Sequence, residues 1–170
     1  MSFKKNILYA FLISILLISC GKILPEGNLE KKEIPVDQFV NLDLKGKFRV
    51  FYARGDKNFV EVETYPNIAD NLDIEVDDKT LSISEKRQTK GVDFYNVTIY
   101  SKYNLEKISL SDSVEMNISS EITTDNFKLN LQNTATFMGS LNTRKADVEM
   151  RNSSRANFLG ETKEAFIKIS

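Results

Sequence analysis

The chain has 170 residues, of which 41% are hydrophobic and 28% are charged, and its formal net charge is -1. This length allows one domain with a sizeable core, and the composition is that of a folded module, not of a disordered chain or an integral membrane bundle. Nothing in the charge balance indicates a nucleic-acid partner. Because the chain has no His and a single cysteine, Cys20, imidazole catalysis, Cys/His zinc sites and internal disulfides are excluded, and we expect no metal or other cofactor.

Residues 1–19 are predicted to be an export signal peptide. Lys4 and Lys5 form a positive start, and the apolar run at 7–18 is too short to span a bilayer comfortably. The run leads into Leu-Ile-Ser-Cys at 17–20, which resembles the bacterial lipobox. That resemblance implies that Cys20 is acylated and becomes the first residue of the mature protein. The alternative is an ordinary signal peptide with a chance cysteine near its end.

Two or three acyl chains on Cys20 would anchor the protein to a membrane almost permanently. By the same resemblance, Gly21 replaces the aspartate that retains many enteric lipoproteins in the inner membrane. We therefore expect an outer-membrane lipoprotein of the cell envelope, on a leaflet that the sequence leaves open. Residues 20–35 are predicted to be the lipidated N-terminus and a linker, since Pro25, Gly27 and Pro35 interrupt any regular structure.

Short strands are predicted throughout residues 36–103. Phe48, Val50 and Tyr52 recur at every second position, and several later runs do the same. This period of two is typical of half-buried strands. No stretch has a sustained helical period, so we expect no helix longer than one turn, at best at 67–71. The pattern leaves open whether these strands continue the repeat described next or form a separate cap.

From residue 105 onward one strand pattern recurs three times and begins a fourth. Leu110, Leu131, Met150 and Ile169 hold the same place in successive copies, at spacings of 21, 19 and 19 residues. A period near twenty with a strand in every copy predicts a β-solenoid, whose stacked coils bury one continuous core. The alternative is a β-meander within a sandwich. One residue departs from the pattern, because Phe166 occupies an outward position.

A polar residue follows the strand at the same place in three copies: Asp112, Asn133 and Asn152. Short polar side chains suit tight turns and can hydrogen-bond along a stack. We therefore predict a structural turn ladder at these positions. The chain stops one strand into the fourth copy, which predicts an uncapped, open edge at its C-terminal end.

The sequence resembles the family of auto-transporter adhesin head domains over residues 24–170. The residues that carry the resemblance are Gly21 to Asn28, Phe39, Val40, Leu42, Val50, Gly55, Val60 to Val62, Asn71, Leu72 and Leu81 to Ile83. The resemblance implies a right-handed, single-stranded, pectate-lyase-like parallel β-solenoid head domain over 36–170, in lipoproteins or secreted proteins of Bacteroidetes-type bacteria. It brings no catalytic or binding residues. The family's Ser-Gly-Ser-Gly turns are replaced here by turns with Asp and Asn, which also tolerate positive φ.

Three groups of residues are candidates for a functional site. Oxygen ligands for calcium could come from four acids: Asp73, Glu75, Asp77 and Asp78. A solvent-exposed strand face followed by a turn explains these acids better. The Arg-Gly-Asp tripeptide at 54–56 matches an integrin-binding motif, and a hairpin turn explains it better. The surface-binding candidates are three aromatic residues: Tyr95, Tyr100 and Tyr103. Packing within or between strands explains them better.

These observations predict a lipid-anchored cell-envelope protein whose head binds or adheres without catalysis. Its partners are the membrane, through the acyl chains, and a glycan or protein ligand presented to a rigid sheet face. The alternative functions are a periplasm-facing structural or scaffold lipoprotein and, less favoured, a polysaccharide-active enzyme. Paired carboxylates at a set separation would be needed for glycoside hydrolysis, and the repeats contain no acid that recurs in phase.

Overall fold

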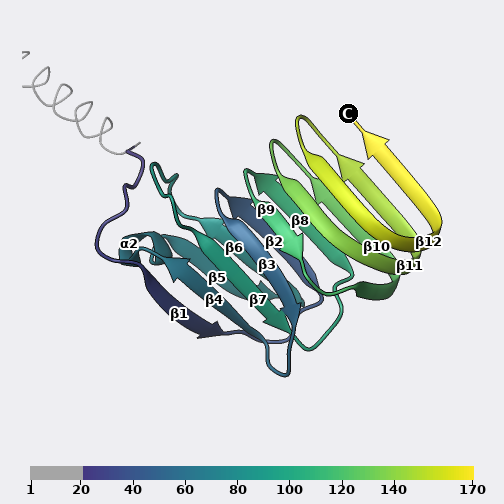
Figure 1. Cartoon of the computed structure of the whole chain (residues 1–170), viewed down its shortest axis with the longest axis horizontal. Coiled ribbons are helices and arrows are strands. Elements are labelled where there is room, and N and C mark those ends of the chain that lie inside the picture. The colour runs from purple at the N-terminus through teal and green to yellow at the C-terminus, as the bar shows by residue number, and fades with distance from the viewer. Residues whose placement is uncertain (1–20) are drawn as a thin grey trace, which may run out of the picture.

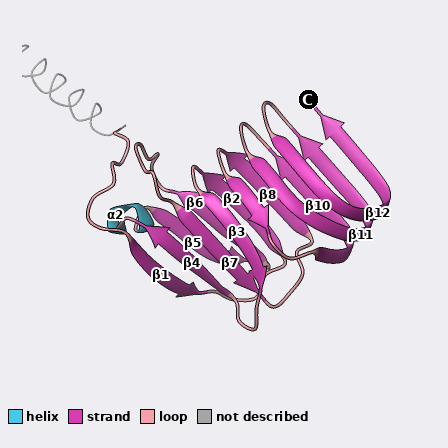
Figure 2. Cartoon of the chain, viewed as in Figure 1, coloured by secondary structure: helices cyan, strands magenta, loops and turns pink. Residues whose placement is uncertain are grey.

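Alternation of apolar and polar residues produces strands along most of residues 21–170, which are the residues that the computed structural model describes. Twelve strands and one short helix result (Figures 1 and 2). In chain order they are β1 (Glu30–Pro35), β2 (Asn41–Gly46), β3 (Arg49–Arg54), β4 (Phe59–Thr64), α2 (Pro66–Ala69), β5 (Leu72–Asp77), β6 (Thr80–Glu85), β7 (Asn96–Ser101), β8 (Lys107–Asp112), β9 (Glu115–Ile118), β10 (Ile122–Leu131), β11 (Thr136–Met150) and β12 (Arg155–Ile169).

All strands belong to one sheet in the order β1-β4-β7-β3-β9-β11-β10-β8-β2-β6-β5, and β12 pairs with β11. The first part of the long strand β11 pairs with β9 and its second part with β10. The sheet therefore folds at β11 into a half-barrel with two walls. We call the side from β9 to β1 the first wall and the side from β10 to β5 the second wall.

The core lies between the two walls. Val50, Tyr52 and Ile99 point inward from the first wall, and Leu44 and Leu110 point inward from the second. Mostly polar residues alternate with them and face outward, as the period of two requires, and Phe51 is an exposed aromatic residue on the outer face. Helix α2 is a single turn that begins at a proline and buries Ile68. It agrees with the expectation of at most one turn of helix in this region.

The all-β class is confirmed, but the predicted right-handed, single-stranded parallel β-solenoid is wrong. Three strand pairs are antiparallel: β1 with β4, β4 with β7, and β5 with β6. The β5–β6 pair has a simple physical cause, because its turn residues Asp78 and Lys79 have φ of 41° and 58°. Positive φ at both central residues makes a tight hairpin, which forces the strands to run antiparallel. The sheet is therefore a mixed half-barrel.

The repeat from residue 105 corresponds to the parallel part of this sheet. Leu110 lies opposite Leu131, Leu131 opposite Met150, and Met150 opposite Ile169. The spacings of 21, 19 and 19 residues are thus the distances along the chain from one parallel neighbour to the next. Figure 1 shows these strands side by side toward β12, at the end opposite β1.

Candidate binding groove

A polar groove of about 350 Å³ lies on the outer face of the second wall. One outward row of residues crosses it, because Asp43, Ser109, Asn130 and Glu149 are register partners on four successive strands, β2, β8, β10 and β11. Outward positions in a sheet are aligned by the strand register. The groove is therefore a direct product of the parallel pairing that buries the core behind it.

The depth of the groove comes from differences in side-chain length. Ser109 and Ser111 are short and form part of its floor, whereas Lys128, Gln132 and Arg151 are long and border it. Asn130 donates from Nδ2 to Ser109 Oγ at 3.3 Å. Its Oδ1 atom is buried and has no hydrogen-bond partner among the described residues. That oxygen is an acceptor that a ligand or a water molecule can use, since buried polar atoms are nearly always paired.

Glu149 supplies the charge at one border of the groove. Its Oε1 atom lies 2.8 Å from Arg151 Nη2 and 3.3 Å from Lys168 Nζ. Hydrogen bonds from Arg151 and then Lys168 lower the pKa of the Glu149 carboxyl below its ordinary value, so the carboxylate stays ionised. Both ion pairs of Glu149 are accessible to solvent, so they position the side chains more than they stabilise the fold.

The turn-ladder residues lie at or just beyond the ends of β8, β10 and β11, at one edge of the second wall. Asp112, Asn133 and Asn152 have φ of 62°, 62° and 61°. Asn133 Nδ2 donates to Asp112 Oδ1 at 3.0 Å, and Asn152 Nδ2 donates to Asn133 Oδ1 at 3.1 Å. Asp and Asn adopt this left-handed conformation more readily than other non-glycine residues. The stacked side chains hold successive turns in line.

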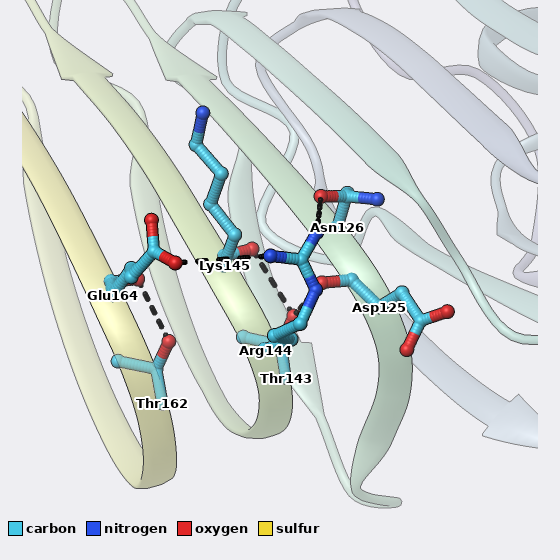
Figure 3. A network of polar contacts seen from close by, with 7 residues as sticks. All are labelled: Asp125, Asn126, Thr143, Arg144, Lys145, Thr162 and Glu164. Carbon is cyan, nitrogen blue, oxygen red and sulfur yellow. Dashed lines mark hydrogen bonds and ion pairs between the residues drawn. The ribbon is translucent and has the colours of Figure 1, made fainter.

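A second ladder, which the sequence analysis missed, lies where the last strands bend. Thr124, Thr143 and Thr162 are register partners, and each donates from Oγ1 to the carbonyl two residues ahead, at 3.4, 3.1 and 2.9 Å. Figure 3 shows the last two of these bonds. The regular spacing of 19 residues was the signal that could have revealed this ladder.

At the same bend, the charged side chain of Arg144 contacts residues on both neighbouring strands. Arg144 Nη2 donates to Asn126 Oδ1 at 3.1 Å, and its Nη1 lies 3.7 Å from Glu164 Oε1 (Figure 3). Arg144 therefore links β10 to β12 through β11. These residues are exposed, so the links fix the shape of the bend more than they contribute to stability.

The three tyrosines do not form one surface. Tyr95 is buried against Phe48, with ring centroids 5.5 Å apart, so it cannot serve in surface binding. Tyr100 stacks on Phe59 of the neighbouring strand, with centroids 4.4 Å apart. Tyr103 is 40% exposed. Packing between strands accounts for Tyr95 and Tyr100, and only Tyr103 presents a large exposed surface. Cys20 lies outside the described residues.

A half-buried carboxyl, Glu85, lies in a second polar hollow near the turn ladder. It accepts hydrogen bonds from Thr89 Oγ1 at 2.9 Å and from the Lys47 amide at 3.1 Å. Burial raises the pKa of Glu85 above its ordinary value, and the nearby Asp112 adds to this effect. Burial also raises the pKa of the neighbouring Tyr95 hydroxyl, so that group stays protonated.

The raised pKa of Glu85 predicts how this site affects stability with pH. The folded protein binds the Glu85 proton more tightly than the unfolded chain, so its contribution is fully present below the ordinary pKa of 4.5 and is lost as pH rises through the raised pKa. Glu85→Gln mimics the protonated acid at every pH. We expect this variant to match the wild type near pH 4 and to exceed it in urea-unfolding midpoint near pH 7. Equal midpoints at both pH values would contradict the prediction, and Glu106→Gln is the control.

Two further properties of residues 21–170 bear on function. No group of three or more His, Cys, Asp or Glu side chains within them could hold a metal ion. None of their helices is long and apolar enough to cross a membrane. The acids considered for calcium lie along β5 and in its turn, where Asp73 and Glu75 have Ser84 and Ser82 as register partners.

Comparison with known proteins finds a matching family model and several solved structures with a similar fold. The family model described as "Putative auto-transporter adhesin, head GIN domain" matches residues 38–170. A crystal structure of a putative adhesin from Bacteroides fragilis is similar, with a TM-score of 0.74 and 22% identity over 84% of this chain and 67% of that chain. A putative adhesin from Parabacteroides distasonis has a TM-score of 0.74 and 20% identity, over 87% and 68% of the two chains.

A third similar structure carries a different description. It is a putative lipid binding protein from Parabacteroides distasonis, with a TM-score of 0.58 and 17% identity over 88% of this chain and 95% of that chain. No curated protein matches the chain. At these sequence identities the solved structures show a common fold only. They do not indicate which ligand this chain binds.

Proposed function

The chain belongs to the family of auto-transporter adhesin head GIN domains, and from this premise we propose that it is a non-catalytic adhesion module of the cell envelope whose polar groove binds a glycan. The observation that carries the proposal is the groove itself. It places the free Asn130 Oδ1 beside serine, amide, carboxylate and guanidinium groups on a rigid sheet.

The chemistry of the groove suits hydroxyl-rich ligands. Its volume of about 350 Å³ lies within the usual range of roughly 300–1,000 Å³ for ligand sites. Planar groups such as those of Asp43, Asn130, Gln132 and Arg151 can each make paired hydrogen bonds to neighbouring sugar hydroxyls. The serine floor lets a flat ring approach the backbone of β8. A protein ligand is the competing possibility, because the face is also long and rigid.

The separation of the acids supports a binding role over hydrolysis. Asp43 and Glu149 lie on β2 and β11, three strand spacings apart, which corresponds to roughly 14 Å between their backbones. Glycoside hydrolases place their two carboxyls about 5–9.5 Å apart. Glu149 is also held by Arg151 and Lys168. We therefore propose that the groove retains its ligand without cleaving it.

Binding to immobilised glycans and extracellular-matrix proteins tests this function. We expect the wild-type chain to retain at least one glycan, and Asn130→Ala to weaken that binding about tenfold through loss of a buried hydrogen bond. Asn117→Ala is the matched control, since Asn117 faces outward from the first wall and its replacement should leave binding unchanged. Retention of a matrix protein with no glycan would favour the protein ligand. Retention of nothing, or equal loss in both variants, would overturn the proposal.

We further propose that acylation of Cys20 anchors the module to the outer membrane. Metabolic labelling with an alkynyl fatty acid should mark the wild-type chain and not Cys20→Ala. Protease treatment of intact cells, with a C-terminal tag on the chain and a known periplasmic lipoprotein as control, then tests orientation. Cleavage of the head alone is the expected result for an adhesin. Survival of both proteins until the outer membrane is opened would instead favour the periplasm-facing scaffold.

A further inference from the structure

Ile23 is fastened to the loop that follows β6. The Ile23 amide donates to Gln88 O and the Lys90 amide donates to Ile23 O, both at 2.9 Å, and Ile23 is the parallel bridge partner of Thr89. The Ile23 side chain also packs against the core. Figure 1 shows the start of the described chain, in purple, beside this loop. Three residues after Cys20, the chain is therefore already part of the folded head.

Helix α2 holds the residues that follow. Asn67 Nδ2 donates to Leu24 O at 2.7 Å, and the Glu26 amide donates to Asn67 Oδ1 at 3.0 Å. From Glu30 onward, β1 pairs with β4. All of these contacts use backbone groups of the segment that connects Cys20 to the sheet. That segment consequently has little free length with which the head could move away from Cys20.

The distance from Cys20 to the head is short. A fully extended chain spans at most about 3.6 Å per residue, so Ile23 lies within roughly 11 Å of Cys20. When Cys20 is held at a membrane surface, the side chains around Ile23 are held close to the lipid headgroups. Their chemistry then decides whether the head contacts the bilayer.

The two segments that are paired through Ile23 carry one sign of charge. Residues 21–25 and 86–92 contain four basic and no acidic side chains. We call these two segments the anchor-side surface. Lys86 Nζ lies 3.2 Å from Asp70 O, at the end of α2. All four cations are exposed: Lys22, Lys86, Arg87 and Lys90. Anionic groups can therefore approach them from solvent.

The charge is more balanced at the borders of the anchor-side surface. Asp70 is paired with Lys32 at 3.6 Å, and Glu85 is half-buried and already accepts two hydrogen bonds. Glu26 and Asp93 follow the two segments in the chain. The net charge stays positive, but salt confines its effect to about 8 Å. The surface attracts anions only when it is held close to them, and a short connection to an anchored Cys20 provides this.

An exposed apolar side chain lies within the same surface. Leu24 is 58% exposed, although its backbone is fixed by Asn67. Leu29, farther along the segment, is 48% exposed. Interfacial membrane contacts combine these two kinds of group, because cations bind the headgroups and an apolar side chain enters the boundary with the acyl chains.

We propose that the anchor-side surface docks on the bilayer that holds Cys20, with its cations on the anionic headgroups of phospholipids and Leu24 at the acyl boundary. The proposal rests on the proposed acylation of Cys20 and goes beyond it, because it assigns an orientation to the head. The anchor makes the second contact intramolecular, so a small charged surface suffices. The β12 end of the sheet then lies away from the bilayer (Figure 1).

Tryptophan fluorescence tests the docking, because the chain has no Trp of its own. The full chain is purified from the cell envelope and reconstituted in vesicles of phosphatidylcholine, alone or mixed equally with phosphatidylglycerol, with brominated acyl chains as the quencher. Leu24→Trp should be quenched and shifted to shorter wavelength, more strongly with phosphatidylglycerol. Met138→Trp replaces a 50% exposed side chain on β11 and should not be quenched. No quenching of Leu24→Trp, or equal quenching of both reporters, would overturn the proposal.

Charge reversal tests whether the cations make the contact. In the Leu24→Trp chain, quenching should be lost when three changes are combined: Lys22→Glu, Arg87→Glu and Lys90→Glu. The matched control makes the same change in net charge at exposed positions outside the surface and should leave quenching unchanged: Lys57→Glu, Lys102→Glu and Lys163→Glu. Circular dichroism verifies that both triple variants remain folded. Equal quenching in the two triple variants would contradict docking on anionic headgroups.

Mass spectrometry of the purified chain keeps this test separate from the test of anchoring. If Cys20 carries acyl chains, the vesicles report on docking alone. If it carries none, the proposed anchoring fails, and a chain that begins at Cys20 is coupled through its single thiol to a maleimide lipid before reconstitution. The same fluorescence outcomes then support or overturn the docking of the head.

Discussion

Leu110→Ala is expected to lower the free energy of unfolding by about 2–5 kcal/mol, because it leaves a cavity in the centre of the second wall. Leu110 is 1% exposed and lies between Leu44 and Leu131 in the parallel register. Both neighbours are fully buried, so few side chains can relax into the space. Urea unfolding followed by circular dichroism measures the loss as a lower midpoint at an unchanged slope.

The control for this prediction is the same change at an exposed position. Leu24 precedes β1 and is 58% exposed, so Leu24→Ala is expected to change stability by less than about 0.5 kcal/mol. If both variants lost the same stability, the core between the two walls would not be the main source of stability. A lower slope in Leu110→Ala would instead indicate that the unfolding is no longer two-state.

Asn133→Ala is expected to cost about 1–3 kcal/mol by disturbing the middle of the turn ladder. Alanine at φ of 62° carries a steric cost of about 1–2 kcal/mol. The change also removes the hydrogen bonds to Asp112 and from Asn152, each worth about 0.5–1.5 kcal/mol when fully protected and less at this exposed site. Thermal and urea unfolding measure the combined effect.

Two other replacements at the same position separate these causes. Asn133→Gly retains access to positive φ and loses only the side-chain bonds, so it should be less destabilised than Asn133→Ala. Asn133→Asp tolerates the turn but places a second carboxylate beside Asp112, and its loss of stability should shrink as salt is added. Equal stability of the alanine and glycine variants would show that the left-handed conformation is not what the asparagine provides.

The local features of the repeat could be predicted because they depend on neighbouring residues. The alternation around Leu110 and Leu131 identified the inward face of each strand, and their spacing identified the parallel partners. Short polar residues after each strand identified turns with positive φ at Asp112 and Asn133.

The pairing of distant strands could not be predicted in the same way. β4 lies between β1 and β7 in the sheet, and nothing in its own sequence distinguishes antiparallel from parallel neighbours. The predicted parallel β-solenoid was wrong because β4 pairs antiparallel with both β1 and β7. The packing partner of Tyr95 could not be predicted for a related reason, because alternation does not reveal that Phe48, from the connection between β2 and β3, packs against its ring.

Local sequence patterns are sufficient to predict that this protein is built of strands, which face of each strand is buried, and where the parallel copies align. These properties follow from hydrophobic period, turn chemistry and repeat length, all of which act over a few residues. The mixed order of the sheet and the groove around Asn130 depend on the tertiary structure. Those properties arise when residues far apart in the chain become neighbours, so their physical cause is the register between strands and not the composition of any one of them.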